Sequence, residues 1–94
     1  MEDPDWFTSP LREVRCEPLF LEQIDALGID PEKLEEALSA LDYALSKHPE
    51  VFPSIPFTPF SRALLYIYQD APLLRVFFTF DAVQVKLVSI EFAE

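Results

Sequence analysis

The run from residue 73 to residue 92 constrains the fold more than any other part of the sequence. Two segments rich in Val, Phe and Ile, residues 73–80 and 83–92, flank the dipeptide Asp81-Ala82. β-Branched and aromatic residues favour strands, and two such segments around a short break are typical of a β-hairpin. Because side chains alternate between the two faces of a strand, the run predicts one apolar face and one mixed face.

The register follows if Asp81 and Ala82 form a two-residue loop, so that Phe80 lies opposite Val83. A slip by one residue would bring polar side chains to the core face, because the alternation has a period of two. The expected core face carries Leu74, Val76, Phe78, Phe80, Val83, Val85, Leu87 and Ser89. The opposite face carries Leu73, Arg75, Phe77, Thr79, Gln84, Lys86, Val88 and Ile90.

The preceding segment, Ser61 to Gln69, leads to the same assignment of faces. If Gln69 lies opposite Pro72, then Tyr66 lies directly across from Arg75, and Lys86 is a diagonal neighbour of Arg75 on the next strand. The three segments together predict an antiparallel three-stranded meander. Its second face, turned away from the core, is expected to carry Arg62, Tyr66, Tyr68, Arg75 and Lys86.

The N-terminal half predicts a short strand followed by two helices. The strand covers residues 12–16. The first helix begins near Pro18, and Gly28 is well placed just past its end. The second begins after Asp30, which suits the N-cap, and stops before Pro49. Its apolar stripe repeats at intervals of three and four residues, at Leu34, Ala37, Leu38, Leu41, Ala44 and Leu45.

Two segments carry no regular pattern. Residues 1–11 are expected to form a loose arm, in which Trp6 and Phe7 either stay free or dock onto the body or a partner. Residues 49–60 contain four prolines and no glycine, with large apolar side chains between them. This loop either packs across the sheet edge or the helices, or it binds a partner.

The expected order of elements is β-α-α-β-β-β, which is typical of an α+β fold. We expect two N-terminal helices packed on one face of a small twisted antiparallel sheet. The 94 residues form a single domain over positions 1–94.

The charge distribution narrows the classes of partner. The net charge is −10, and residues 1–50 hold 13 of the 17 acids. Such a chain repels nucleic acid at long range, because binding depends on Lys and Arg neutralising phosphates. The acidic N-terminus and the lack of an apolar run of roughly 20 residues predict a cytoplasmic protein that does not enter a membrane.

Several kinds of site are excluded by composition. The single glycine leaves no glycine-rich phosphate loop. One histidine, His48, and one cysteine, Cys16, do not make a transition-metal site. We therefore expect no metal and no cofactor, with His48 at a helix end and Cys16 as a small buried residue.

The second face of the meander is the remaining candidate site. Arg75 presents a planar charged fork suited to phosphate, while Tyr66 and Lys86 can donate protons. These three are the candidate catalytic residues, and Arg62, Tyr68 and Phe77 are the candidate binding residues. The alternative is an ordinary amphipathic sheet surface with nothing bound.

The chain also resembles the RelE/ParE superfamily of bacterial toxins, which belong to type II toxin–antitoxin pairs. The strand from Leu74 to Asp81 is similar to the family pattern Tyr-Arg-Val-x-Tyr-x-Val-Asp. The segment 83–90 is similar to the family's final hydrophobic strand, and His48-Pro49 lies where the family often has Asn-Pro. The resemblance implies a small α+β fold and places Arg75 at the middle-strand arginine that steadies the phosphate in RNA-cleaving members.

Two functions are consistent with these observations. The resemblance implies a toxin-like protein that is neutralised by an antitoxin-like partner and acts on translation or on DNA gyrase, although the net charge disfavours an RNA, ribosome or gyrase target. The alternative is a non-catalytic protein-interaction module on the same scaffold, which could be a homodimer. Leu64, Leu73, Phe77, Val88 and Ile90 are the apolar residues expected to be exposed in that interface.

Overall fold

The computed structural model describes residues 11–67 and 73–93, and over these residues the protein has an α+β fold. The expected arm over residues 1–11, with Trp6 and Phe7, lies outside the described residues except for Leu11, and so does Tyr68. The elements in chain order are β1 (Glu13–Cys16), α2 (Pro18–Leu27), α3 (Pro31–Lys47), the 3-10 helix η1 (Pro49–Val51), β2 (Ser61–Tyr66), β3 (Leu73–Phe80) and β4 (Gln84–Phe92).

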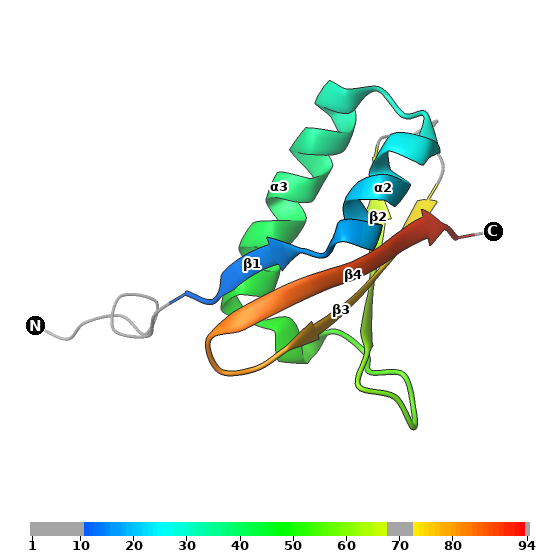
Figure 1. Cartoon of the computed structure of the whole chain (residues 1–94). Coiled ribbons are helices and arrows are strands. Elements are labelled where there is room, and N and C mark those ends of the chain that lie inside the picture. Colours follow the sequence, from blue (N-terminus) through cyan, green and yellow to red (C-terminus); the bar gives the residue numbers. More distant parts are fainter. Residues whose placement is uncertain (1–10, 68–72, 94) are drawn as a thin grey trace, which may run out of the picture.

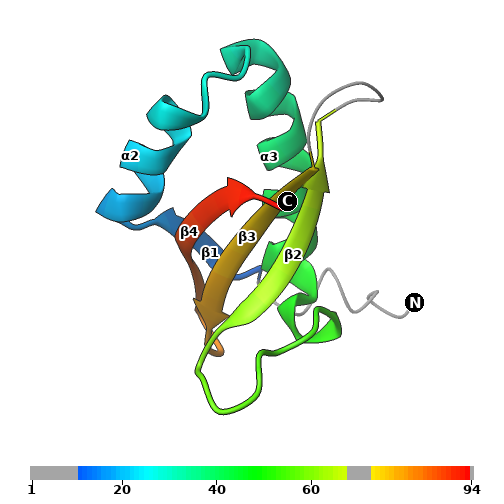
Figure 2. The same ribbon diagram turned by 90° about the vertical axis from the view of Figure 1, so that its right-hand side faces the viewer.

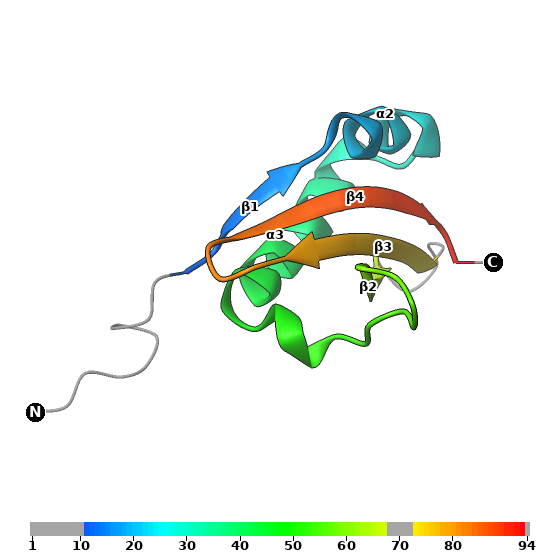
Figure 3. The same ribbon diagram turned by 60° about the horizontal axis from the view of Figure 1, so that its bottom comes forward.

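The strands form one sheet with the order β1-β4-β3-β2, as Figure 3 shows. The antiparallel meander of β2, β3 and β4 is confirmed. However, β1 pairs with β4 in parallel, which makes the sheet mixed rather than antiparallel throughout. α2 and α3 carry the chain over the sheet from β1 to β2 at the opposite edge, and the meander of β2, β3 and β4 then brings β4 beside β1 in the same direction.

Local sequence signals set the helix ends as expected. Pro18 is the first residue of α2, and Gly28 follows its end in the left-handed conformation with φ 70°. At the start of α3 the Asp30 carboxylate accepts a hydrogen bond from the Glu32 backbone N–H at 3.1 Å. The helix ends at Lys47, directly before His48 and Pro49.

Both helices lie on the same side of the sheet, and β2, β3 and β4 pass in front of α3 in Figure 2 (see also Figure 1). The core lies between the two layers. It consists of Phe20, Leu34, Leu41, Leu45, Ala63, Leu65, Leu74, Val76, Phe78, Val85, Leu87 and Ile90. The opposite side of the sheet has no helix over it in the described part of the chain, and we call it the uncovered face.

The pairing of β2 with β3 differs from the expected register by two residues. Tyr66 lies opposite Leu73, and Leu64 rather than Tyr66 lies opposite Arg75. The last described pair is Tyr66 with Leu73, whereas a tight turn at residues 70–71 would place Tyr66 opposite Arg75. A shift of two residues preserves the alternation, which explains why the predicted faces of β2 and β3 are nevertheless correct.

The turn between β3 and β4 is also longer than expected, because Phe80 lies opposite Val85 rather than Val83. The Asp81 carboxylate accepts hydrogen bonds from the backbone N–H groups of Val83 at 2.8 Å and Gln84 at 2.9 Å. An aspartate that bonds to its own backbone stabilises a wider turn. The dipeptide Asp-Ala lacks the glycine that a two-residue turn prefers.

A β-bulge in β4 changes the faces of its last residues. Phe78 lies opposite Leu87 and Phe77 lies opposite Ser89, so Val88 is an extra residue. Ile90 is therefore 1% exposed in the core, and Ser89 is on the uncovered face. The sequence analysis was wrong for both residues, because it placed Ser89 on the core face and Ile90 on the opposite face. The Gln23 side chain of α2 accepts a hydrogen bond from the Ile90 N–H at 2.8 Å.

Residues 53–60 form a projecting loop, which we call the finger; it is the light green loop at the bottom of Figure 2. The chain before it packs as expected, since Phe52 meets Phe78 edge to face at 5.8 Å. The tip does not pack on the sheet or the helices, because Phe57 is fully exposed. Phe57 also has φ 65°, a conformation that costs a non-glycine residue roughly 1–2 kcal/mol.

Among the described residues, no helix has the length and the apolar character needed to cross a membrane.

Candidate functional site

The uncovered face combines apolar and basic side chains. Four of the chain's seven bases lie there, although the net charge of the whole chain is −10. The bases are Arg15, Arg62, Arg75 and Lys86, and the acids on the same face are Glu13 and Glu91. Leu64, Tyr66, Leu73 and Phe77 contribute the apolar surface between them.

Arg75 is at the centre of this face, in the middle of β3. It lies between Leu64 on β2 and Glu91 on β4. Its Nη2 atom pairs with Glu91 Oε2 at 3.0 Å, and the arginine side chain is 31% exposed. Within the described residues its buried Nε has no hydrogen-bond partner. The exposed part of the Arg75 side chain, rather than this buried atom, is what an external carbonyl or carboxylate can reach.

The three candidate catalytic residues do not form the expected cluster. Tyr66 is a diagonal neighbour of Arg75 instead of lying directly across from it. Lys86 lies opposite Thr79, four residues along β3 from Arg75, which is roughly 13 Å at the usual rise per residue. The predicted register was therefore wrong on both sides of Arg75. Tyr66 remains a diagonal neighbour of Arg75, and Lys86 lies out of its reach.

Two of the three candidate binding residues, Arg62 and Phe77, lie around Arg75 together with Tyr66, while the third, Tyr68, lies outside the described residues. Arg62 lies opposite Phe77 and diagonal to Arg75, and Tyr66 is 72% exposed on the other diagonal. Phe77 is half-buried next to them on β3. Arg62, Phe77 and Tyr66 thus form a continuous surface with Arg75, of the mixed aromatic and arginine type that is enriched in protein interfaces.

The helical layer has the opposite charge. Exposed acids on the two helices are Glu22, Asp25, Glu32, Glu35 and Glu36. The molecule is therefore polarised, with an acidic helical side and a sheet face on which bases outnumber acids. A charged partner approaching this protein is oriented by that separation.

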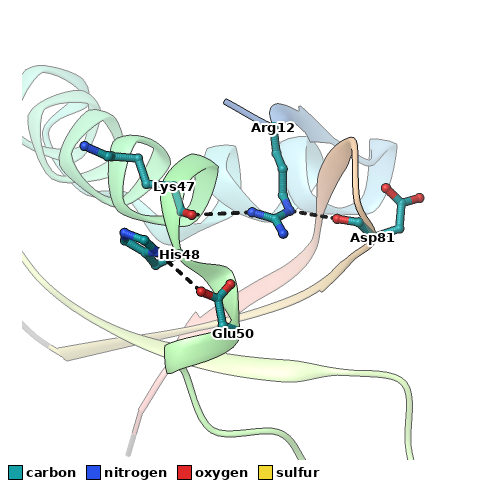
Figure 4. A network of polar contacts seen from close by, with 5 residues as sticks. All are labelled: Arg12, Lys47, His48, Glu50 and Asp81. Carbon is teal, nitrogen blue, oxygen red and sulfur yellow. Dashed lines mark hydrogen bonds and ion pairs between the residues drawn. The ribbon is translucent and has the colours of Figure 1, made fainter. Parts of the chain in front are cut away.

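A second polar cluster joins three elements at the other end of the molecule (Figure 4). The Arg12 guanidinium donates from Nε to the Asp81 carbonyl at 2.7 Å and from Nη1 to the Lys47 carbonyl at 3.4 Å. It also lies 5.8 Å from the centre of the Phe80 ring. Arg12 thus ties the start of β1 to the end of α3 and to the β3–β4 turn.

The carboxylates of this cluster are stabilised in their charged forms. The pKa of Glu50 is lowered, mainly by a hydrogen bond from its own backbone N–H and then by the hydrogen bond to His48 at 3.3 Å. The pKa of Asp81 is lowered by the backbone N–H groups of Val83 and Gln84. Since each acid is held by local backbone, we interpret this cluster as structural.

Asp42 and Cys16 lie on the helical side of the sheet. Partial burial raises the pKa of Asp42, and its Oδ1 atom has no hydrogen-bond partner among the described residues. Partial burial and the nearby Asp42 charge raise the pKa of the Cys16 thiol. Cys16 is exposed rather than buried as predicted. Within residues 11–67 and 73–93, no three or more His, Cys, Asp or Glu side chains are grouped to hold a metal ion.

Two important residues were missed by the sequence analysis. Glu91, the ion-pair partner of Arg75, would lie on the core face in a regular strand, and only the bulge brings it to the uncovered face. The switch of apolar residues from odd positions up to Leu87 to even positions from Ile90 is the signal that could have revealed it. Arg12 carries no comparable signal, because its contacts come from segments far apart in sequence.

No protein-family model matches the chain, and no curated protein matches it significantly. The functional argument therefore rests on the geometry of the uncovered face.

Proposed function

We propose that this protein is a non-catalytic binding module that holds a partner protein on the uncovered face of its sheet. The observation that supports this proposal is the composition of that face, where four of seven bases and several apolar side chains lie together in a chain of net charge −10. Leu64 and Tyr66 are exposed and do not belong to the core, so their apolar surface does not stabilise the monomer.

The same composition describes the partner. Arg62 and the exposed part of Arg75 favour carboxylates or carbonyl oxygens, because arginine donates in a fixed fork. Tyr66 and Phe77 favour apolar side chains between those oxygens. We therefore expect an acidic segment with interspersed apolar residues, bound more weakly at high salt, since charge attraction at a surface is screened.

Site-directed photocrosslinking in cells that normally make the protein tests this proposal. A benzophenone amino acid at position 64, which is 48% exposed on the uncovered face, should give a defined protein adduct. The same group at Ser39, exposed on α3, is the matched control and should give none. Arg62→Glu should reduce the adduct from position 64. Equal adducts from both positions, or none from position 64, would refute the proposal.

A toxin-like protein that acts on translation or DNA gyrase is the second candidate. The order β-α-α-β-β-β and the position of Arg75 in the middle of an uncovered strand favour it, because the RelE/ParE resemblance implies both. Induced expression in bacteria should then arrest growth. Arg75→Ala should abolish the arrest while the protein stays folded, and Lys86→Ala should not, since Lys86 lies far from Arg75. Normal growth on induction would exclude this candidate.

A further inference from the structure

The tip of the finger presents a bulky side chain in an unusual backbone conformation. The Thr58 N–H bonds to the Ile55 carbonyl at 3.2 Å, which closes a turn with Pro56 and Phe57 at its centre. The φ of 65° at Phe57 corresponds to the third position of a type II turn, where glycine or asparagine is preferred. Among residues 11–67 and 73–93, Phe57 is the only non-glycine residue with positive φ.

Phe57 does not contribute to the core of its own chain. Its relative exposure is 106%, so the ring projects fully into solvent. Strain at a position that adds nothing to folding indicates a function outside the isolated chain. Glycine at this position would remove both the strain and the exposed apolar surface.

The finger is held in shape by hydrogen bonds along its length. Arg62 N–H donates to the Pro53 carbonyl at 2.9 Å, and Ile55 N–H donates to the Phe60 carbonyl at 2.9 Å. The Thr58 hydroxyl donates to the Ile55 carbonyl at 2.9 Å. Three prolines within residues 53–59 restrict the backbone further. Phe57 is therefore presented by a preorganised loop, which lowers the entropy lost on binding.

An open hollow lies directly beside the finger. Its volume is about 410 Å³, and it is lined by Glu50, Phe52, Ser54, Pro59, Ser61 and Phe80. Pockets for drug-sized ligands measure roughly 300–1,000 Å³, so one benzyl side chain fits easily. Ser61 and Phe80 lie on the covered side of the sheet, as their partners Phe78 and Val85 do. The hollow is therefore separate from the proposed binding face.

The finger itself carries no charge, although Glu50 lines the hollow and Arg62 follows shortly after it. Residues 51–61 contain no charged side chain, although the chain as a whole has a net charge of −10. Two copies of so acidic a protein repel one another at long range. A segment without charges adds no repulsion of its own when two copies meet through it.

We propose that two copies of this chain associate through their fingers, with Phe57 of each copy entering the hollow of the other. The finger carries the exposed ring and also contributes Ser54 and Pro59 to the hollow, so a two-fold axis beside it would let each copy supply both a ring and a hollow. The ring then lies against Phe52, Phe80 and Pro59, where aromatic pairing adds to apolar burial. Contacts of this small size produce a weak, reversible dimer.

Sedimentation equilibrium of the full chain across a concentration series tests the proposal. The wild type should dimerise reversibly. Phe57→Gly should weaken dimerisation about tenfold or more, because it removes a central aromatic anchor. It should still fold, since glycine accommodates the positive φ. Ser54→Trp, which fills the hollow, should weaken dimerisation similarly. Val51→Ala is the matched control, since Val51 is exposed in the same neutral segment but does not line the hollow.

The response to salt distinguishes this interface from the binding face. Salt should strengthen the finger dimer, because it screens the repulsion between two acidic chains and favours apolar burial. Self-association of the basic sheet face with the acidic helices of another copy would weaken with salt instead. A wild type that stays monomeric throughout, a Phe57→Gly dimer as strong as the wild type, or weakening by salt would each overturn the proposal.

Discussion

The two faces of β3 carry neighbouring residues into opposite environments. Val76 and Phe78 point toward the helices and are fully buried, whereas Arg75 and Phe77 point to the uncovered face. Both faces are rich in large side chains, yet only the covered face contributes to the core. The apolar side chains of β3 on the uncovered face therefore do not contribute to the core, and they are available to bind a partner.

The largest expected effect contrasts Phe78 with Phe77. Phe78→Ala removes a fully buried ring and should lower the free energy of unfolding by about 3–5 kcal/mol. A domain of this size has about 5–14 kcal/mol in total, so much of its stability would be lost. Phe77→Ala should cost about 1 kcal/mol. Urea unfolding of both variants measures the difference, and equal losses would contradict the separation of the faces.

A smaller effect is expected at the edge of the covered face. Gln23→Ala removes the acceptor for the Ile90 N–H, and an unpaired backbone donor should cost about 1–3 kcal/mol. Gln23→Glu retains an acceptor oxygen and should lose less. Glu22→Ala, one residue earlier on the exposed side of α2, is the control and should change little. Thermal unfolding of the three variants ranks them, and a destabilised Glu22→Ala would implicate the helix itself.

The uncovered face should behave oppositely, with small effects on folding and large effects on binding. Arg75→Met keeps an apolar stem and removes the ion pair with Glu91, which at a surface is worth about 0–1 kcal/mol. We therefore expect a nearly unchanged midpoint of urea unfolding and a clear loss of the crosslink from position 64. Glu91→Gln frees Arg75 and should preserve or increase that crosslink. A strongly destabilised Arg75→Met would assign Arg75 a structural role.

The smallest effect concerns Asp42. Its pKa is raised by burial, so its charged form destabilises the fold at neutral pH. Asp42→Asn should raise the melting temperature slightly at pH 7. This advantage should shrink as pH falls through the raised pKa and vanish below the ordinary value of 3.8, where wild-type Asp42 is protonated in both the folded and the unfolded state.

The Asp42→Asn change should also lower the pKa of the Cys16 thiol, because it removes a nearby negative charge. Faster alkylation of the thiol would confirm that contact, and an unchanged rate would contradict it.

Short-range patterns predicted most of the fold. The caps at Asp30 and Gly28 and the apolar stripe of α3 act within a few residues, so the sequence alone determines the helices. The faces of β2 and β3 were correct for the same reason, since alternation is local. The length of the β3–β4 turn was not, because the Asp81 carboxylate accepts from the backbone N–H groups of Val83 and Gln84, and the presence of an aspartate does not by itself fix how many residues the turn contains.

The candidate site could be predicted only in part. Arg62, Tyr66, Arg75 and Phe77 share a face, as alternation requires. Their distances depend on register. The two-residue error between β3 and β4 moved Lys86 away from Arg75, and the error between β2 and β3 moved Tyr66 from the position opposite Arg75 to a diagonal one. The parallel pairing of β1 with β4, which adds Arg15 to the same face, joins segments about seventy residues apart and has no local signal.

The extra residue Val88 has a further consequence for how β4 tolerates change. A chain without it would read Leu87, Ser89, Ile90, Glu91 in strict in-and-out order, with every side chain on its present side. Deletion of a single residue normally exchanges the two faces of a strand beyond it. Deletion of Val88 is therefore expected to be well tolerated, because it leaves every other side chain of β4 on its present face. Insertion or deletion of one residue anywhere between Ser89 and Phe92 would instead exchange interior and exterior downstream.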